Sequence, residues 1–179
     1  MSILVIILLV IAGLIALIFI IGLFSRKGYA ISRSININAP TQEVFNYVKH
    51  LKNKDNYNTW AMEDPSKKTE FRGTDGTVGF VYAWKGNRKV GEGEQEIKNI
   101  IEGKRVDIEM RFIKPFAATS QSSFITASQG AGQTDLTLEM SGAMKYPLNI
   151  ILLFMNTDKT MGKGVEKSLS ELKKILEKN

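Results

Sequence analysis

The chain begins with an unbroken hydrophobic run. Residues Ile3 to Phe24 contain no charged side chain, and most of them are Ile, Leu, Val or Phe. At a rise of about 1.5 Å per residue, a helix of this length covers about 33 Å and crosses a hydrocarbon core of about 30 Å. A cleaved signal peptide needs a shorter apolar core and a small-residue cleavage site, which Phe24-Ser25-Arg26-Lys27 does not offer. We therefore expect residues 3–24 to be an uncleaved transmembrane anchor.

The basic residues around this run indicate its orientation. Arg26, Lys27 and Arg33 follow it, whereas no Lys or Arg precedes it. Positive residues are enriched on the cytoplasmic side of a membrane. The sequence therefore predicts a single-pass protein of the cell membrane whose C-terminal domain lies in the cytoplasm. Residues 25–30 are interpreted as a linker and residues 31–179 as one domain.

Beyond the linker, the pattern predicts mostly strands. Ile31, Ile35 and Ile37 alternate with polar residues and predict a first strand, although Arg33 interrupts their hydrophobic face. A short helix is expected after Pro40. Strict alternation then returns in segments separated by polar or glycine-containing turns: residues 69–72, 80–84, 92–98, 106–112, 119–127 and 136–140. Such segments are typical of antiparallel strands with one dry face and one solvated face.

The hydrophobic period changes toward the C-terminus. Hydrophobic residues recur every three or four positions in a stripe that consists of Met161, Val165, Leu169, Leu172 and Leu176. This spacing predicts a long amphipathic helix, with Gly162 and Gly164 interpreted as a kink between two helical stretches. One sheet with a single dry face and one such helix give an α+β domain in which the sheet curls around the helix.

The segment Ile150–Met155 is hydrophobic over more than one helix face. Three interpretations stay open for it. It is a fully buried first turn of the C-terminal helical region, a lid over a cavity, or a segment that rests on the bilayer.

Composition and charge exclude several kinds of functional site. The 179 residues include 24 Lys and Arg, 18 Asp and Glu, one His and no Cys. The absence of Cys excludes disulfides, a thiol nucleophile and Cys-based metal sites, and a single His excludes a His-rich metal site. The net charge of +6 is spread along the chain rather than clustered, so a nucleic-acid partner is not expected. The sequence predicts neither a metal site nor a cofactor.

Two titratable features were weighed as sites. Glu92, Glu94 and Glu96 share one strand face, about 7 Å apart, which is too far for one metal ion. They are interpreted as a solvated outer face. His50 lies at the predicted end of the first domain helix, where the helix dipole accounts for it. We expect neither feature to be catalytic.

A series of short motifs points to a family. In chain order they are Ile35-Asn36-Ile37-Asn38-Ala39-Pro40, Trp60, Asp64-Pro65, Trp84-Lys85-Gly86-Asn87, Val90-Gly91-Glu92-Gly93, Lys114-Pro115-Phe116, Ser141-Gly142, Tyr146-Pro147 and Glu166-Lys167-Ser168-Leu169. With this order of elements, the chain resembles the START-like or polyketide cyclase/dehydrase superfamily (SRPBCC), and within it the bacterial membrane-anchored branch. The resemblance implies the helix-grip fold, a curved antiparallel sheet around a long C-terminal helix. It also implies a cavity between sheet and helix that accepts apolar ligands.

Candidate cavity residues follow from this resemblance and from the aromatic and Met residues on the predicted inner faces. They are Trp60, Phe80, Tyr82, Trp84, Met110, Phe112, Phe124, Met140 and Met155. Aromatic side chains supply area and Met fills irregular shapes, although plain core packing explains any one of them.

Three functions were weighed for the domain. The first is binding of an apolar or amphipathic small molecule, such as a lipid, next to the membrane. The second is a cyclase or dehydratase type of enzyme with Tyr82 or Glu70 as acid/base groups. The third is an interaction module without a ligand. The sequence contains no paired carboxylates, triad or cofactor loop, which disfavours catalysis. It does not give the oligomeric state.

Overall fold

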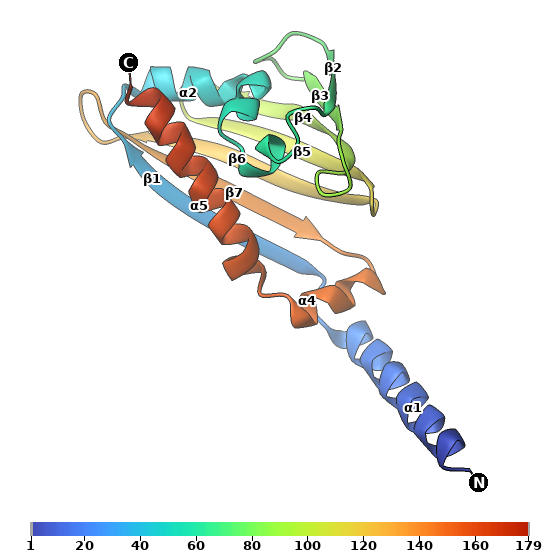
Figure 1. The fold of residues 1–179 in the computed structure, drawn as a ribbon. Coiled ribbons are helices and arrows are strands. Elements are labelled where there is room, and N and C mark those ends of the chain that lie inside the picture. Colours follow the sequence, from blue (N-terminus) through green and yellow to red (C-terminus); the bar gives the residue numbers. More distant parts are fainter. Residues whose placement is uncertain (1, 179) are drawn as a thin grey trace.

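A single long helix projects from a curved sheet that holds a second long helix (Figure 1). The computed structural model describes residues 2–178, so Asn179, the last residue of the predicted domain, lies outside the described residues. The elements are α1 (Ile3–Phe24), β1 (Gly28–Ile37), α2 (Thr41–Lys49), the 3-10 helix η1 (Leu51–Asn56), α3 (Thr59–Met62), β2 (Lys68–Arg72), β3 (Val81–Lys85), β4 (Glu92–Ile101), β5 (Arg105–Lys114), β6 (Ala118–Ser128), β7 (Thr134–Ala143), the 3-10 helix η2 (Leu148–Ile150), α4 (Ile151–Phe154) and α5 (Thr157–Leu176).

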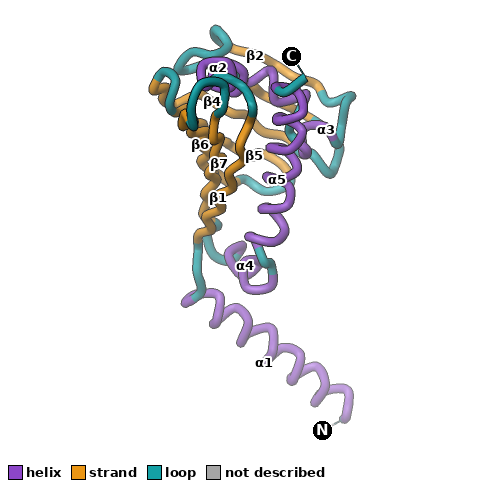
Figure 2. Tube along the Cα trace, turned by 90° about the vertical axis from the view of Figure 1, so that its left-hand side faces the viewer, coloured by secondary structure: helices purple, strands orange, loops and turns teal. Residues whose placement is uncertain are grey.

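The strands form one antiparallel sheet in the order β1-β7-β6-β5-β4-β3-β2. Strands β2 to β7 are consecutive neighbours, whereas β1 pairs with β7, from Gly28 opposite Ala143 to Ile37 opposite Thr134. Residues alternate between buried and partly exposed along the central strands, as in β5 and β7. The sheet therefore has one dry face, and Figure 2 shows α5 and α3 on the same side of it. The predicted α+β helix-grip architecture is confirmed.

Helix α5 closes the dry face with its hydrophobic stripe. Val165, Leu169 and Leu172 are buried in the same core cluster as Ile37 of β1 and Leu136 of β7. The predicted kink is wrong, because α5 runs as one helix from Thr157 to Leu176. Burial of one amphipathic face against the sheet keeps the helix continuous through its two glycines.

Those glycines allow other side chains to approach the helix closely. A Cβ atom at Gly162 would overlap the guanidinium group of Arg33, and one at Gly164 would overlap the indole ring of Trp60. The absence of a side chain at both positions therefore lets β1 and α3 lie against α5.

Arg33 faces the helix rather than the solvent. It shares the α5-facing side of β1 with Ile31 and Ile35, and its Nε atom lies 2.6 Å from Glu166 Oε1. Its Nη2 atom lies 2.9 Å from Asp158 Oδ1. The residue that interrupts the hydrophobic pattern of β1 thus makes two ion pairs with α5.

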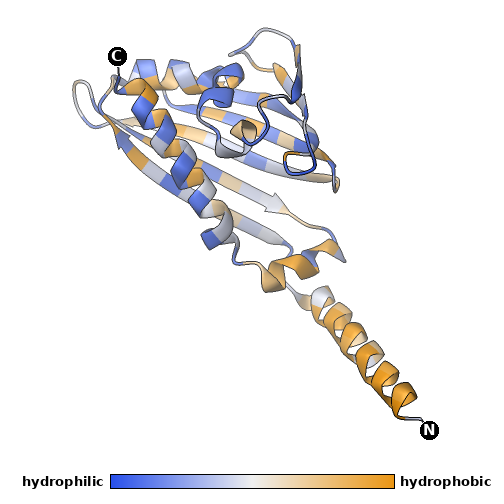
Figure 3. Ribbon diagram, viewed as in Figure 1, coloured by the Kyte–Doolittle hydropathy of each residue, from blue (hydrophilic) through white to orange (hydrophobic). Residues whose placement is uncertain are grey.

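Helix α1 joins the domain through a short connection with several contacts. Asn149 Nδ2 donates a hydrogen bond of 2.7 Å to the Gly22 carbonyl, and Arg26 Nη2 donates one of 3.0 Å to the Leu152 carbonyl. Strand β1 already begins at Gly28, earlier than predicted, because residues 28–30 pair with residues 141–143 of β7. Only residues 25–27 therefore connect α1 to the sheet. Figure 3 shows that hydrophobic residues dominate both α1 and the neighbouring α4.

Candidate functional site

A cavity of about 250 Å³ lies between the dry face of the sheet, the segment η1–α3 and the start of α5. Alternating residues of five neighbouring strands point into it, because side chains on one face of a strand recur at every second position. Its apolar wall includes Tyr82, Trp84, Ile108, Met110, Phe112, Phe124, Leu138, Met140 and Met161. The volume is close to the lower end of the range for small-molecule sites, about 300–1,000 Å³.

Most of the candidate residues come together at this cavity, but two do not. Trp60, Tyr82, Trp84, Met110, Phe112, Phe124 and Met140 line it. Phe80 is fully buried in the core, where its ring stacks on Phe71 with 6.2 Å between the ring centres. Met155 follows α4 next to α1, and its carbonyl accepts a hydrogen bond from Arg26. Phe80 shares a face with Tyr82 but lies closer to the end of the sheet, and Met155 precedes the part of α5 that lines the cavity.

Lys54 also lines the cavity, and sequence reasoning missed it. The residue is on η1 with 8% of its surface exposed. Its Nζ atom lies 4.2 Å from the centre of the Tyr82 ring and 4.9 Å from that of Trp84, which is the geometry of cation–π contacts. Within residues 2–178, no hydrogen bond or ion pair joins Lys54 Nζ to another side chain. Burial lowers the pKa of Lys54 to about 7, although the negative charge of Asp55 opposes the shift.

The neighbouring carboxylate has other partners. Tyr82 Oη donates a hydrogen bond of 2.7 Å to Asp55 Oδ1, and Lys67 Nζ lies 3.1 Å from the same oxygen. Burial and the hydrogen bond to Asp55 raise the pKa of Tyr82 far above its usual range. Tyr82 therefore stays protonated, and its hydroxyl group stays bound to Asp55, which lies outside the cavity lining.

Two polar side chains of the sheet face the cavity, Gln95 on β4 and Ser122 on β6, and Asn58, Glu63, Lys67 and Lys89 line it from the segments outside the strands. Gln95 and Ser122 are buried, with 9% and 7% of their surfaces exposed. Gln95 lies opposite Tyr82 of β3, and thus next to the ring that Lys54 covers. Ser122 lies opposite Ile108 and Met140, on the other side of β5. The polar groups Lys54 and Gln95 therefore lie at one end of the cavity, and a mostly apolar wall extends from them toward β7.

The other titratable candidates lie outside the cavity. Glu70 is exposed on β2, and its Oε1 atom lies 3.4 Å from Arg72. The His50 ring contacts the Asn46 carbonyl at 2.7 Å, at the C-terminal end of α2. Neither residue faces the groups that surround Lys54.

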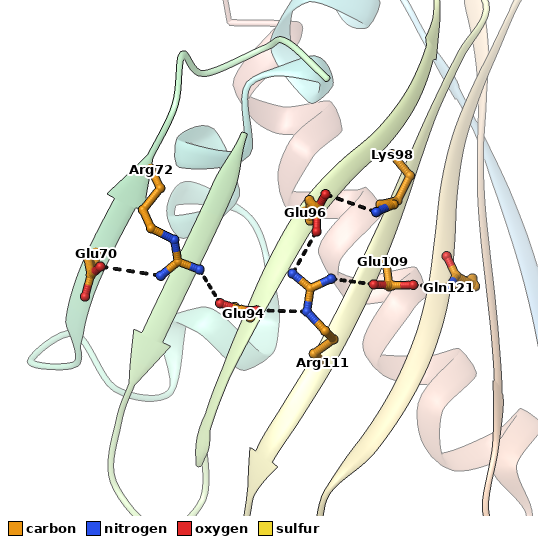
Figure 4. A network of polar contacts seen from close by, with 8 residues as sticks. All are labelled: Glu70, Arg72, Glu94, Glu96, Lys98, Glu109, Arg111 and Gln121. Carbon is orange, nitrogen blue, oxygen red and sulfur yellow. Dashed lines mark hydrogen bonds and ion pairs between the residues drawn. The ribbon is translucent and has the colours of Figure 1, made fainter. Parts of the chain in front are cut away.

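Glu94 and Glu96 of β4 belong to an ion-pair network on the opposite face of the sheet (Figure 4), and Glu92 of the same strand pairs with Lys114 at 3.1 Å. Arg111 lies 2.8 Å from Glu94 and 2.8 Å from Glu96, and it also contacts Glu109. Hydrogen bonds from Arg72 and Arg111 lower the pKa of Glu94, and hydrogen bonds from Lys98 and Arg111 lower the pKa of Glu96. Among residues 2–178 there is no cluster of acidic or His side chains suited to a metal ion. The network accounts for the glutamates as a structural feature of the outer face.

A second hollow lies toward α1 and shares Phe112 and Met161 with the cavity. Its other lining residues include Tyr29 at the start of β1 and Met144, whose backbone N–H donates a 2.7 Å hydrogen bond to the Lys27 carbonyl. Phe112 and Met161 therefore separate the cavity from a space that lies beside the end of α1.

The segment Ile150–Met155 is only partly buried. Leu152 packs inside, whereas Ile151, Leu153 and Phe154 are 42%, 41% and 75% exposed. A fully buried first turn is thus excluded. The exposed side chains surround α4, which lies beside the C-terminal end of α1.

Comparisons with known proteins support the fold. No protein-family model matches the chain, and no curated protein matches it by sequence. Among solved structures, norcoclaurine synthase from Thalictrum flavum, in complex with dopamine and hydroxybenzaldehyde, is similar with a TM-score of 0.64 and 11% identity, over 89% of this chain and 92% of that one. Mll3558 from Rhizobium loti is similar with a TM-score of 0.61 and 14% identity, over 82% of this chain and 95% of that one. Ara h 8.0201 is similar with a TM-score of 0.56 and 11% identity, over 85% of this chain and 99% of that one.

These structural similarities establish the fold of the chain. The chain has the helix-grip fold, and its structural neighbours are of the Bet v 1-like or SRPBCC type. Identities this low establish the fold and leave the ligand and the activity to be argued from the site.

Proposed function

We propose that this protein is a membrane-anchored binding protein that holds an apolar or amphipathic small molecule, such as a lipid, between the sheet and α5. The observation that carries the proposal is the cavity of about 250 Å³, whose wall consists mainly of aromatic, Met and aliphatic side chains. A cavity of this size lowers the stability of a domain because the side chains around it lack packing partners. A ligand of matching shape would supply those contacts. A solved neighbour, norcoclaurine synthase, holds small aromatic molecules on the same fold.

An enzyme of cyclase or dehydratase type is less well supported. The Tyr82 hydroxyl group already donates a hydrogen bond to Asp55, and Glu70 lies outside the cavity. Neither of the two acid/base groups that the sequence suggested is therefore free inside the cavity.

The membrane part of the proposal starts from α1. This is one helix long and apolar enough to cross a bilayer. Arg26 and Lys27 at its C-terminal end favour a cytoplasmic domain on a single-pass protein of the cell membrane. The exposed Ile151, Leu153 and Phe154 lie where α1 would leave the bilayer, so α4 would rest in the interfacial region. The second hollow would then open close to the lipid, which gives an apolar ligand a short path from the membrane.

A cavity-filling variant tests the binding function. The full-length protein is purified from cells in detergent, and small molecules that leave with it are extracted and measured by mass spectrometry. Ser122→Phe adds a ring inside the cavity, whereas Gln121→Phe adds the same ring on the exposed face of the same strand. We expect a small molecule to accompany the wild type and Gln121→Phe and to be lost from Ser122→Phe. Equal amounts in all three proteins, or none in any, would contradict the proposal.

A pair of reporter fusions tests the orientation. A fluorescent protein fused after the last residue folds in the cytoplasm, whereas alkaline phosphatase becomes active only after export. We expect fluorescence and no phosphatase activity, and the reverse result would place the domain on the other side.

A further inference from the structure

A purely apolar ligand leaves the buried amine of Lys54 unexplained. Its ammonium group is buried next to two aromatic rings, and in the described residues no carboxylate is paired with it. The nearest candidate, Asp55, already binds Tyr82 and Lys67. A buried charge is costly without a partner, so the site lacks one negative group.

The side chains around Lys54 indicate which kind of negatively charged ligand group would pair with it. Gln95, at the same end of the cavity, is buried and forms no side-chain hydrogen bond within residues 2–178, so its amide is available as a donor. Apart from Ser122, the wall toward β6 and β7 is apolar, with Phe124, Leu138 and Met140. Asn58, Glu63, Lys67 and Lys89 also line the cavity, but Lys67 is paired with Asp55 and Asn58 caps α3. The buried part of the site thus combines a cation without a carboxylate partner and an amide with a long apolar surface.

We propose that the ligand is an amphipathic monocarboxylic acid, with its carboxylate between Lys54 and Gln95 and its apolar body along β5, β6 and β7. This inference rests on the binding function proposed above. The negative charge of Asp55 next to Lys54 disfavours a doubly charged phosphate head. A volume of about 250 Å³ also leaves no room for a lipid with two long chains. A carboxylate with a single chain or a compact ring system meets both limits.

The burial of Lys54 is consistent with this chemistry. Without a ligand, desolvation favours the neutral amine, and the lowered pKa of about 7 reflects this. A bound carboxylate would favour the charged form and restore an ion pair inside the cavity. The ligand would therefore supply the partner that the protein does not.

Tryptophan fluorescence gives a direct test, because both tryptophans of the chain, Trp60 and Trp84, line the cavity. The probes are 11-bromoundecanoic acid and 11-bromoundecanol, which carry the same quenching bromine and differ in the head group. Each is titrated into the full-length protein in a non-fluorescent detergent. We expect the acid to quench the wild type at a concentration at least tenfold lower than the alcohol does.

Two variants of η1 identify the group responsible. Lys54→Met removes the buried charge, and we expect it to abolish the preference for the acid while it leaves quenching by the alcohol within about twofold. Lys52→Met removes the same charge from an exposed position on the same helix and should keep the preference. Circular dichroism confirms that each variant is folded.

The outcomes separate the two proposals. If acid and alcohol quench equally in the wild type, and Ser122→Phe weakens both, the cavity binds ligands but the monocarboxylate proposal is wrong. If Ser122→Phe changes neither titration, the quenching comes from the micelle and the binding function itself fails. Loss of the acid preference in Lys52→Met would assign it to surface charge and would also overturn the proposal.

Discussion

The guanidinium group of Arg33 on β1 lies directly against Gly162 of α5, so that a single Cβ atom at Gly162 would collide with it. This contact lets Arg33 reach Glu166 and Asp158, which lie on either side of Gly162 in the helix. The edge strand and the long helix are therefore joined by an arginine whose guanidinium group occupies the space beside Gly162.

Substitution of Gly162 should separate the two elements. Gly162→Leu displaces Arg33 and overpacks the β1–α5 contact, so we expect it to lower the free energy of unfolding by about 1–3 kcal/mol. Lys163→Leu places the same side chain at the next, exposed position and should change it by less than about 0.5 kcal/mol. Urea unfolding of the full-length protein in detergent, followed by tryptophan fluorescence, measures both. An equal effect of the two substitutions would show that the Arg33 contact does not contribute.

The hydrophobic stripe of α5 leads to a second prediction. Leu169 is buried near the middle of the helix, so Leu169→Ala should cost about 2–5 kcal/mol of stability. Lys167→Ala is the control, because Lys167 is exposed and should change stability by no more than about 0.5 kcal/mol. Lys173 is unsuitable for this purpose, since its Nζ atom binds Glu177 at 2.9 Å. If Leu169→Ala were as mild as its control in the same unfolding assay, α5 would not be held by the sheet.

The buried amine of Lys54 should make stability depend on pH. Its pKa is about 7 in the folded protein, below its ordinary value of 10.5. Between these values the unfolded chain binds more protons than the folded one, so this residue makes stability rise with pH. Below pH 7 both states are protonated and the folded protein carries the full cost of the buried charge. The charged or titratable side chains around it are Asp55, Tyr57, Glu63, Lys67, Tyr82 and Lys89.

Removal of the amine should therefore stabilise the protein mainly at low pH. We expect Lys54→Met to raise the free energy of unfolding by a few kcal/mol at pH 6 and by much less at pH 10. Urea titrations of the wild type and the variant in detergent, at several pH values, give the difference. A gain that did not shrink with increasing pH would mean that Lys54 titrates normally.

The position of α4 is testable because the chain contains no Cys. Phe154→Cys introduces one labelling site on the exposed face of α4, and Lys167→Cys introduces one on the exposed face of α5. With an environment-sensitive fluorophore in lipid vesicles, we expect the label at position 154 to be quenched by lipids that carry a spin label in the acyl chain. The label at position 167 should not be quenched. Equal quenching at both positions would contradict an interfacial α4.

The fold could be predicted from the sequence because its elements follow two simple periods. The alternation in β5 and β7 and the three-to-four spacing in α5 each identify a buried face locally, without knowledge of the partner. The same alternation places the aromatic and Met residues of the strands on the inner face, whereas the expectation of a cavity there came from the family resemblance.

The features that sequence reasoning missed depend on partners far away in the chain. Lys54 lies in a polar stretch that is typical of an exposed loop, and only the packing of η1 on Tyr82 and Trp84 buries it. Gly162 and Gly164 were interpreted as a kink because Arg33 and Trp60, which occupy the space beside them, are more than a hundred positions away. Local patterns carry no information about such pairings.

The short connection between α1 and β1 limits how far the domain with its cavity can move away from α1. Residues 25–27 form the whole connection, Arg26 binds the Leu152 carbonyl, and Asn149 binds the end of α1. A domain on a long flexible linker could deliver its cargo to a second membrane. In the bilayer that we propose for α1, this domain would instead diffuse in two dimensions with the lipid around it. It would exchange its ligand with that lipid or with neighbours in the same leaflet, and would act as a local store rather than a shuttle.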